Sequence, residues 1–182
     1  SDVFLIKTDV DGDTVWTKTF GDGDSQYGKY IQQTTDNGYI ITGYGVETGS
    51  KYLLLIRTDV NGDSVWIKTF DDFSFSGDVE GISVHQTIDG GYIVTGSPFF
   101  VLKTDSLGNE EWRQTYIFGN NSPGGGNHIE QTSDGGYIVI TGELLIKLNS
   151  SGFTEWTNED MGGNFFQQTS DGGFVVVGQF ID

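Results

Sequence analysis

The chain has 182 residues, with 26 acidic side chains against nine basic ones and a formal net charge of −17 at pH 7. A surface this negative repels phosphate backbones and anionic lipid head groups, so we expect neither nucleic-acid binding nor attachment to a membrane surface. No apolar run reaches the roughly 18 residues of a membrane-spanning helix, so we also predict no membrane insertion.

Two sequence markers alternate along the chain, and each occurs four times. The first is a Lys-Thr-Asp-like triplet followed about nine residues later by a tryptophan. The tryptophans are Trp16, Trp66, Trp112 and Trp156. The second is a Gln-Thr-x-Asp-Gly-Gly-Tyr-like segment, which begins at Gln33, Gln86, Gln131 and Gln168 and has Asn37 for the first glycine in the first copy and Phe174 for the tyrosine in the last. This alternation indicates four copies of one repeat of about 45 residues.

The strand-like runs follow one another without any helical periodicity. The chain opens on an apolar run at 3–7 that corresponds to the third strand of a repeat. The second copy shows all four strands, at 82–87, 92–96, 100–104 and 110–116, and the last copy ends on a second strand at 174–178. Asp-Gly or Asn-Gly between the first two strands predicts a type I′ hairpin turn. Asp-x-x-Gly before each tryptophan predicts a type I turn followed by a left-handed glycine.

Four-stranded meanders at this spacing are typical of propeller blades. We therefore predict an all-β fold: a four-bladed β-propeller with four-stranded antiparallel blades, formed by residues 1–182 as a single domain. The predicted blades are 28–70, 80–116, 127–160, and 163–182 together with 1–21. In this last blade the N- and C-terminal strands pair and close the ring, which removes open sheet edges. An open solenoid and a fragment of a larger propeller are the alternatives.

The repeat resembles kelch-like repeats, and more closely the Gly-Gly-Tyr-Ile-x-x-Gly … Leu-Ile-Lys-Thr-Asp-x-x-Gly-x-x-x-Trp repeats of bacterial and archaeal surface proteins. The resemblance covers nearly the whole chain. It implies a propeller blade and a secreted or cell-surface setting, and it implies almost nothing about the ligand. A targeting signal is not part of the sequence, which begins with Ser1, so we expect a processed or excised segment.

Alternating carboxylates in two of the Asp-x-x-Gly loops suggest a calcium site. Its candidate ligands are Asp9, Asp11, Asp13, Asp59, Asn61 and Asp63. Oxygen ligands of this kind suit a hard cation. The third and fourth loops lose the carboxylates but keep the turn glycine, which favours a structural hairpin over a metal site. We therefore predict no obligatory cofactor, with calcium at the first two loops as the alternative.

Residues that differ between copies are better candidates for a specific site than residues that recur. On the predicted innermost strand, the position before the repeated Gln-Thr pair is Gln32, His85, Glu130 and Gln167 in the four copies. Both histidines of the chain, His85 and His128, lie on this strand in adjacent repeats. The hypothesis is a metal or small polar ligand held by His85, His128 and Glu130 near a central channel. Ordinary polar residues around water are the alternative.

The loops that follow the outer strand are the other candidates. One contains Phe73 and Phe75 beside acidic residues, and we expect these rings to be exposed and able to meet a sugar face or a protein partner. The equivalent loop at 118–127 is rich in Gly and Asn. Both loops could equally be variable spacers.

We interpret the chain as a non-enzymatic binding or structural module that recognises carbohydrate or a protein partner through its loops and channel mouth. No triad, phosphate loop, zinc helix or unrepeated carboxylate pair is recognisable in the sequence, which argues against an enzyme. A polysaccharide hydrolase and a purely structural or assembly repeat are the alternatives. The sequence makes no prediction of oligomeric state.

Overall fold

The computed structural model describes residues 1–21, 23–71, 73, 77–116 and 124–178. Strands, turns and bends make up this part of the chain, and all of its strand pairs are antiparallel. None of its residues belongs to a helix long and apolar enough to cross a membrane. The Phe75 prediction and most of the 118–127 loop lie outside the described residues.

The chain divides into two compact units, Ser1–Gly81 and Ile82–Asp182. The first unit holds β1 (Val3–Thr8) and β2 (Thr14–Phe20), followed by a four-stranded meander. The strands of that meander are β3 (Ser25–Gln33), β4 (Tyr39–Glu47), β5 (Ser50–Thr58) and β6 (Ser64–Phe70). The unit boundary falls near the start of β7.

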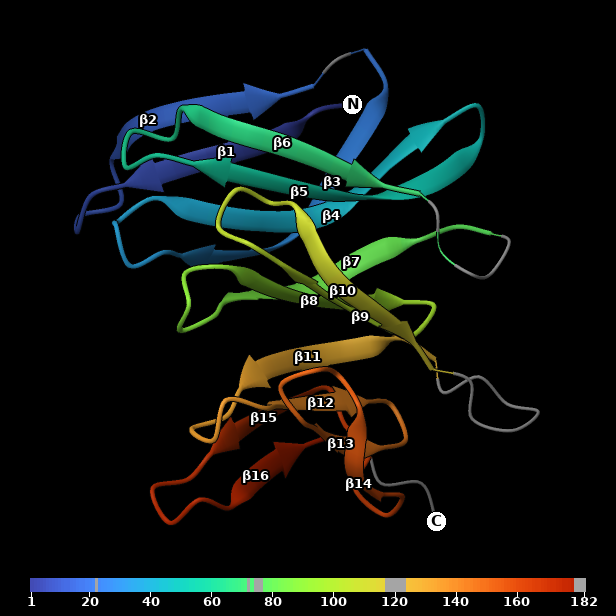
Figure 1. Ribbon diagram of the computed structural model, residues 1–182. Coiled ribbons are helices and arrows are strands. Elements are labelled where there is room, and N and C mark those ends of the chain that lie inside the picture. The colour runs from blue at the N-terminus through green and yellow to red at the C-terminus, as the bar shows by residue number, and fades with distance from the viewer. Residues whose placement is uncertain (22, 72, 74–76, 117–123, 179–182) are drawn as a thin grey trace. The chain divides into compact units, whose positions relative to one another are not determined.

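The second unit contains two four-stranded meanders and a hairpin, which can be followed by label in Figure 1. The first meander is β7 (Glu80–Gln86), β8 (Tyr92–Ser97), β9 (Phe100–Thr104) and β10 (Glu110–Thr115). The second is β11 (Gly126–Gln131), β12 (Tyr137–Thr141), β13 (Leu145–Leu148) and β14 (Thr154–Asn158). The hairpin is β15 (Phe165–Gln168) with β16 (Phe174–Val177). The predicted strands of the second copy are confirmed to within two residues at each end.

The turn between the first two strands of each repeat differs from the predicted type I′ form. Type I′ needs two residues with positive φ, whereas each turn has one: Asn37, Gly90, Gly135 or Gly172. In the second repeat the Gly90 amide donates to the Thr87 carbonyl and the Thr87 amide donates to the Gly91 carbonyl. This is a three-residue loop, a type I turn followed by a left-handed residue. The type I′ prediction was wrong. The left-handed glycine predicted for the Asp-x-x-Gly loops is confirmed at Gly12, Gly62 and Gly108, and Gly152 of the Asn149 loop also has positive φ.

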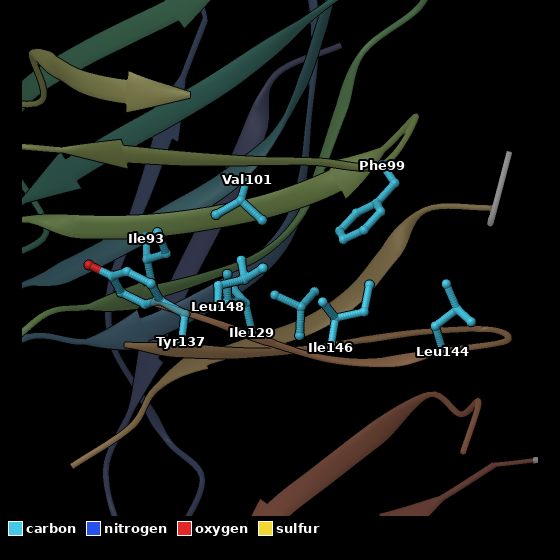
Figure 2. Packing of buried hydrophobic residues seen from close by; sticks show 9 residues of the cluster. Ile93, Phe99, Val101, Ile129, Tyr137, Leu144, Ile146 and Leu148 are labelled. Carbon is cyan, nitrogen blue, oxygen red and sulfur yellow. The ribbon is translucent and has the colours of Figure 1, made fainter. Parts of the chain in front are cut away.

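The cores lie between successive sheets within each unit. In the second unit, residues of β8 and β9 pack against residues of β11, β12 and β13. Figure 2 shows this cluster, which includes Ile93, Val101, Ile129 and Ile146. A smaller cluster joins β12 and β13 to Phe166 of β15. In the first unit, Val3 and Phe20 of the β1–β2 hairpin pack on Ile41, Leu54 and Ile56. The inner strands, such as β9 and β12, are buried on both faces, so their apolar side chains pack one sheet against the next within a unit.

The β1–β2 and β15–β16 hairpins are two separate two-stranded sheets. The sequence predicts that they are the two halves of one blade, joined through β16 and β1. This pairing, the single domain and the blade count of four stay predictions.

Candidate functional site

The aspartate that recurs before the paired glycines anchors a buried cation in each complete sheet. In the second repeat, Asp89 accepts hydrogen bonds from the Thr87 hydroxyl and the Gly91 amide, and it lies 2.9 Å from Lys103 Nζ. Lys103 is 3% exposed and also pairs with Glu111. Equivalent pairs are Asp36 with Arg57 and Asp134 with Lys147. These residues have a structural role, as the sequence predicted from their fourfold recurrence.

The electrostatics of Asp89 follow from these contacts. Burial would raise the pKa of this carboxyl, but hydrogen bonds from Thr87, Lys103 and the Gly91 amide lower it to about 2. The pKa of Asp134 is also lowered, first by its hydrogen bond with Thr132 and then by the Gly136 amide and Lys147. Carboxylates held ionised in this way are acceptors that stabilise the fold, and they are poor general acids.

The two glycines that follow the recurring aspartate are required for different structural reasons. The first adopts positive φ in the turn, as Gly90 and Gly135 do. The second leaves room for the cation: a Cβ on Gly91 would lie 2.6 Å from Lys103 Nζ and would also meet the Thr104 carbonyl. The Gly-Gly pair therefore follows from the turn and the buried ion pair together.

The loops proposed for calcium use their first side chain as a backbone cap. Asp59 Oδ1 accepts hydrogen bonds from the Asn61 amide at 2.8 Å and the Asp63 amide at 2.9 Å. Asp9 does the same with Asp11 and Asp13. The fourth loop keeps both bonds with an amide in place of the carboxylate, because Asn149 Oδ1 accepts from the amides of residues 151 and 153. The hydrogen bonds to the turn amides therefore account for an Asp or Asn at the first position of each loop without a cation. Calcium binding at these loops stays a prediction.

Three of the tryptophans, Trp16, Trp112 and Trp156, each contact an aromatic ring of a neighbouring sheet. Trp16 of β2 meets Tyr39 of β4 edge-on, with ring centroids 6.0 Å apart. Trp112 of β10 meets Tyr137 of β12 in the same way at 5.8 Å. A Cβ on Gly152 would lie 2.6 Å from the Trp112 ring, so this glycine leaves room for the indole against the turn of the next sheet. These aromatic residues belong to the scaffold.

One group of chemically capable side chains stands outside this repeated scaffold. His85 of β7 and His128 and Glu130 of β11 bring their ligand atoms within 4.8 Å of one another. Among the described residues, they form the one group of three or more His, Cys, Asp or Glu side chains that could hold a metal ion. The sequence-based prediction named these three residues, and the structure brings them together.

Strand periodicity explains why the cluster forms. Residues two apart on a strand share a face, so His128 and Glu130 project from the same side of β11. Ser83 and His85 occupy the equivalent positions of β7. β7 and β11 are each the first strand of their sheet. The Ser83 and His85 side chains of β7 therefore lie beside those of His128 and Glu130 on β11. The cluster therefore contains Ser83 as a fourth member.

His128 is held on both ring nitrogens. Its Nδ1 lies 3.2 Å from Ser83 Oγ, and its Nε2 lies 3.1 Å from Glu130 Oε1. The side chain is 2% exposed. Three rings surround it: His85 at a centroid distance of 4.9 Å, Phe165 at 4.3 Å and Phe166 at 5.0 Å. The imidazole orientation is therefore fixed before any ligand arrives.

His85 is neutral at physiological pH. Burial first, and then the neighbouring His128, lower the pKa of this imidazole to about 4, while Glu130 opposes the shift. A neutral imidazole offers a lone pair to a metal or to a hydrogen-bond donor.

The other predicted site residues lie elsewhere. Gln32 is half-buried on β3, and Gln167 is exposed on β15. Phe73 is 6% exposed, so the expectation of an exposed ring at this position was wrong. Sequence reasoning missed Ser83 and Phe165, although both occupy the repeat position of His128, which was the available signal.

Known proteins resemble this chain in structure and not in sequence. No protein-family model matches it, and no curated protein matches it. A protein of unknown function from Bacteroides caccae is similar with a TM-score of 0.63 and 13% identity over 94% of this chain. The structure of YCF48 bound to D1 peptide is similar with a TM-score of 0.53 and 15% identity over 86% of this chain. The fold is that of a β-propeller. This chain spans 63% and 48% of the length of those two propeller-like chains.

Proposed function

We propose that this propeller chain is a binding module without catalytic activity, and that it recognises a positively charged protein segment beside β11 and β15. The observation that carries the proposal is the cluster around His128, where an exposed aromatic ring, Phe165, lies against polar groups that do not recur in the other repeats. Recurring residues are occupied with turns, ion pairs and aromatic packing. A specific ligand is therefore best sought at the residues that differ.

The chemistry of the cluster suits such a segment. Phe165 is 46% exposed and Glu130 is 33% exposed, and each lies against His128, the ring at a centroid distance of 4.3 Å and the carboxylate at 3.1 Å. Aromatic rings beside carboxylates suit Lys and Arg side chains, which use both the charge and the apolar stem. A net charge of −17 also steers a basic partner toward the molecule.

The comparisons support a protein ligand in general terms. YCF48, one of the propeller-like neighbours, binds a peptide. The resemblance of the repeat to those of bacterial and archaeal surface proteins supports a secreted or cell-surface setting, which is part of the proposal.

A pair of arrays tests the proposal. Labelled protein is applied to a peptide array that includes basic sequences and to a glycan array. We expect salt-sensitive binding to basic peptides, and Phe165→Ala should weaken it about tenfold or more. Phe153→Ala is the matched control, because Phe153 is 62% exposed and lies in a scaffold turn.

Three results would contradict the proposal. Selective binding to glycans would show a lectin, and turnover in a polysaccharide hydrolysis screen would show an enzyme. Concentration-dependent assembly in light scattering, without peptide or glycan binding, would show a structural repeat.

A further inference from the structure

We propose that His85, His128 and Glu130 bind a zinc ion that cross-links β7 and β11. The proposal rests on the position of the three donor atoms, on the second contact of His128 and on the composition of the donor set. Because Glu130 would hold the ion in place of a basic side chain, zinc binding is measured on the chain alone and the peptide array on chelator-treated protein, so that either proposal can fail without the other.

The donor atoms have the spacing that a small metal ion needs. Ligands at about 2.0–2.1 Å from tetrahedral zinc lie about 3.3 Å from one another. His128 Nε2 and Glu130 Oε1 are 3.1 Å apart, and all three donor atoms lie within 4.8 Å of one another. Small side-chain rotations of His85 and Glu130, both only partly buried, would bring the set to zinc distances.

Ser83 prepares His128 for this role. Metal-binding histidines commonly use their second ring nitrogen in a hydrogen bond that fixes the ring and the tautomer. Ser83 Oγ lies 3.2 Å from His128 Nδ1. In the tautomer in which Nδ1–H donates to the Ser83 hydroxyl oxygen, the Nε2 lone pair is available to the ion.

The donor set selects a transition metal over calcium. Two imidazoles and one carboxylate suit zinc, whereas calcium takes six to eight oxygen ligands. The ligands come from adjacent sheets of the second unit, so a bound ion would tie β7 to β11 in addition to the apolar contacts beneath them. Three protein ligands leave a fourth tetrahedral position for water.

The other repeats supply a conservative test variant. The position of His85 and Glu130 is glutamine in the first and last copies, at Gln32 and Gln167. The double variant His85→Gln/Glu130→Gln thus places glutamine on β7 and β11, the residue that occupies the same position of β3 and β15. Its fold is checked by far-UV circular dichroism. Gln32→Ala is the matched control, since it alters the same repeat position on β3.

The experiment is calorimetric titration of ZnCl2 into chelator-treated protein, paired with thermal unfolding. We expect one-to-one binding, a higher Tm with zinc, and an affinity loss of about 100-fold or more in the double variant, with Gln32→Ala unchanged. CaCl2 should give no heat that depends on His85 or Glu130.

A spectroscopic measurement locates the ion. The chain contains two histidines, so single variants assign both imidazoles in ¹H–¹⁵N spectra. Zinc should shift the Nε2 resonance of His128. Absence of one-to-one binding, or binding that the double variant retains, would overturn the proposal.

Discussion

The ion pair between Asp89 and Lys103 shows how one residue satisfies several demands of a blade. The carboxylate caps its own turn through Thr87 and Gly91 and also neutralises a cation that is 3% exposed. A buried ammonium group without a counter-charge is strongly unfavourable, so the aspartate and the lysine depend on each other.

Replacing Asp89 by Asn tests this dependence. We expect Asp89→Asn to lower the free energy of unfolding by about 1 kcal/mol at pH 7, a value reduced because the Asp89 side chain is 55% exposed and Lys103 keeps Glu111. The folded-state pKa, about 2, is below the ordinary 3.8. The contribution is therefore complete above about pH 4 and disappears as the pH falls toward 2. Urea unfolding at pH 7, 4 and 3 measures it.

The control for this prediction is Asp160→Asn, which removes an exposed carboxylate with no ion pair in the described structure. A difference between wild type and Asp89→Asn that stayed constant from pH 7 to pH 3 would contradict the role given to the ionised carboxylate.

At the scale of the element, two outer-strand tryptophans each pack against a turn glycine of the next sheet, Trp16 against Gly62 and Trp112 against Gly152. Trp112 of β10 lies over Gly152, in the turn between β13 and β14, and beside Tyr137 of β12. Aromatic packing at the outer strand β10 therefore joins these two sheets of the second unit, in addition to the buried cluster of Figure 2.

Two glycine variants separate the backbone cost from the packing cost. Gly135 and Gly152 have nearly the same φ, +83° and +82°, but a Cβ on Gly135 meets nothing within 4 Å whereas one on Gly152 meets the Trp112 ring. We expect Gly135→Ala to lower the free energy of unfolding by about 1 kcal/mol. Gly152→Ala should lower it by about 2–3 kcal/mol, because overpacking adds to the strain.

Denaturant unfolding gives the two values, and near-UV circular dichroism should change for Gly152→Ala alone. Equal losses for the two variants would show that the Trp112 contact contributes nothing to stability.

The strands and their order could be predicted from sequence, because the period of two and the turn residues recur in every copy. The turn type between the first two strands could not. The Asp-Gly dipeptide fits both a two-residue type I′ turn and the three-residue loop, and the outcome depends on the extra bond from Thr87 to Gly91. The ion pair of Asp89 also escaped prediction, since only the pairing of Ile93 with Lys103 brings the lysine beside the turn.

The cluster around His128 could be predicted in part. His85, His128 and Glu130 stood out because they break the repeat. Ser83 and Phe165 did not, because serine and phenylalanine are common in such strands and only the structure shows their contacts with the imidazole.

At the scale of the whole molecule, the β1–β2 and β15–β16 hairpins expose apolar side chains at several positions. The equivalent side chains of the four-stranded sheets are buried. Phe4 and Ile6 of β1 are 59% and 48% exposed. Their equivalents in β5, Leu54 and Ile56, are 1% and 0% exposed. Val175 of β16 shows the same contrast at 62% exposure. The predicted pairing of β16 with β1 would bury these side chains.

The complete sheets supply the register of that pairing. Ile41 pairs with Ile56 and Val94 pairs with Leu102, so the corresponding pair is Val176 with Ile6. The chain contains no cysteine, and an antiparallel pair has a Cα separation that a disulfide can span. We expect Ile6→Cys/Val176→Cys to form a disulfide within one chain under mild oxidation, seen as faster migration in non-reducing electrophoresis.

The control is Ile6→Cys/Val175→Cys, whose side chains would project from opposite faces and should not cross-link. A disulfide-linked dimer would show that β16 pairs with a second copy, and no cross-link in either variant would leave the four-blade ring without support.

The buried cation of each complete sheet has its counter-charges within that sheet: Arg57 with Asp36, Lys103 with Asp89 and Lys147 with Asp134. A duplicated repeat would therefore contain both members of its buried ion pair. Its contacts with neighbouring repeats would need only apolar and aromatic side chains. Growth of such a protein by tandem copying is easy for this reason. Because each ion pair lies within one sheet, a substitution elsewhere in one repeat does not disturb the pairs of the others. β7 and β11 differ from the other first strands in this way at His85 and Glu130.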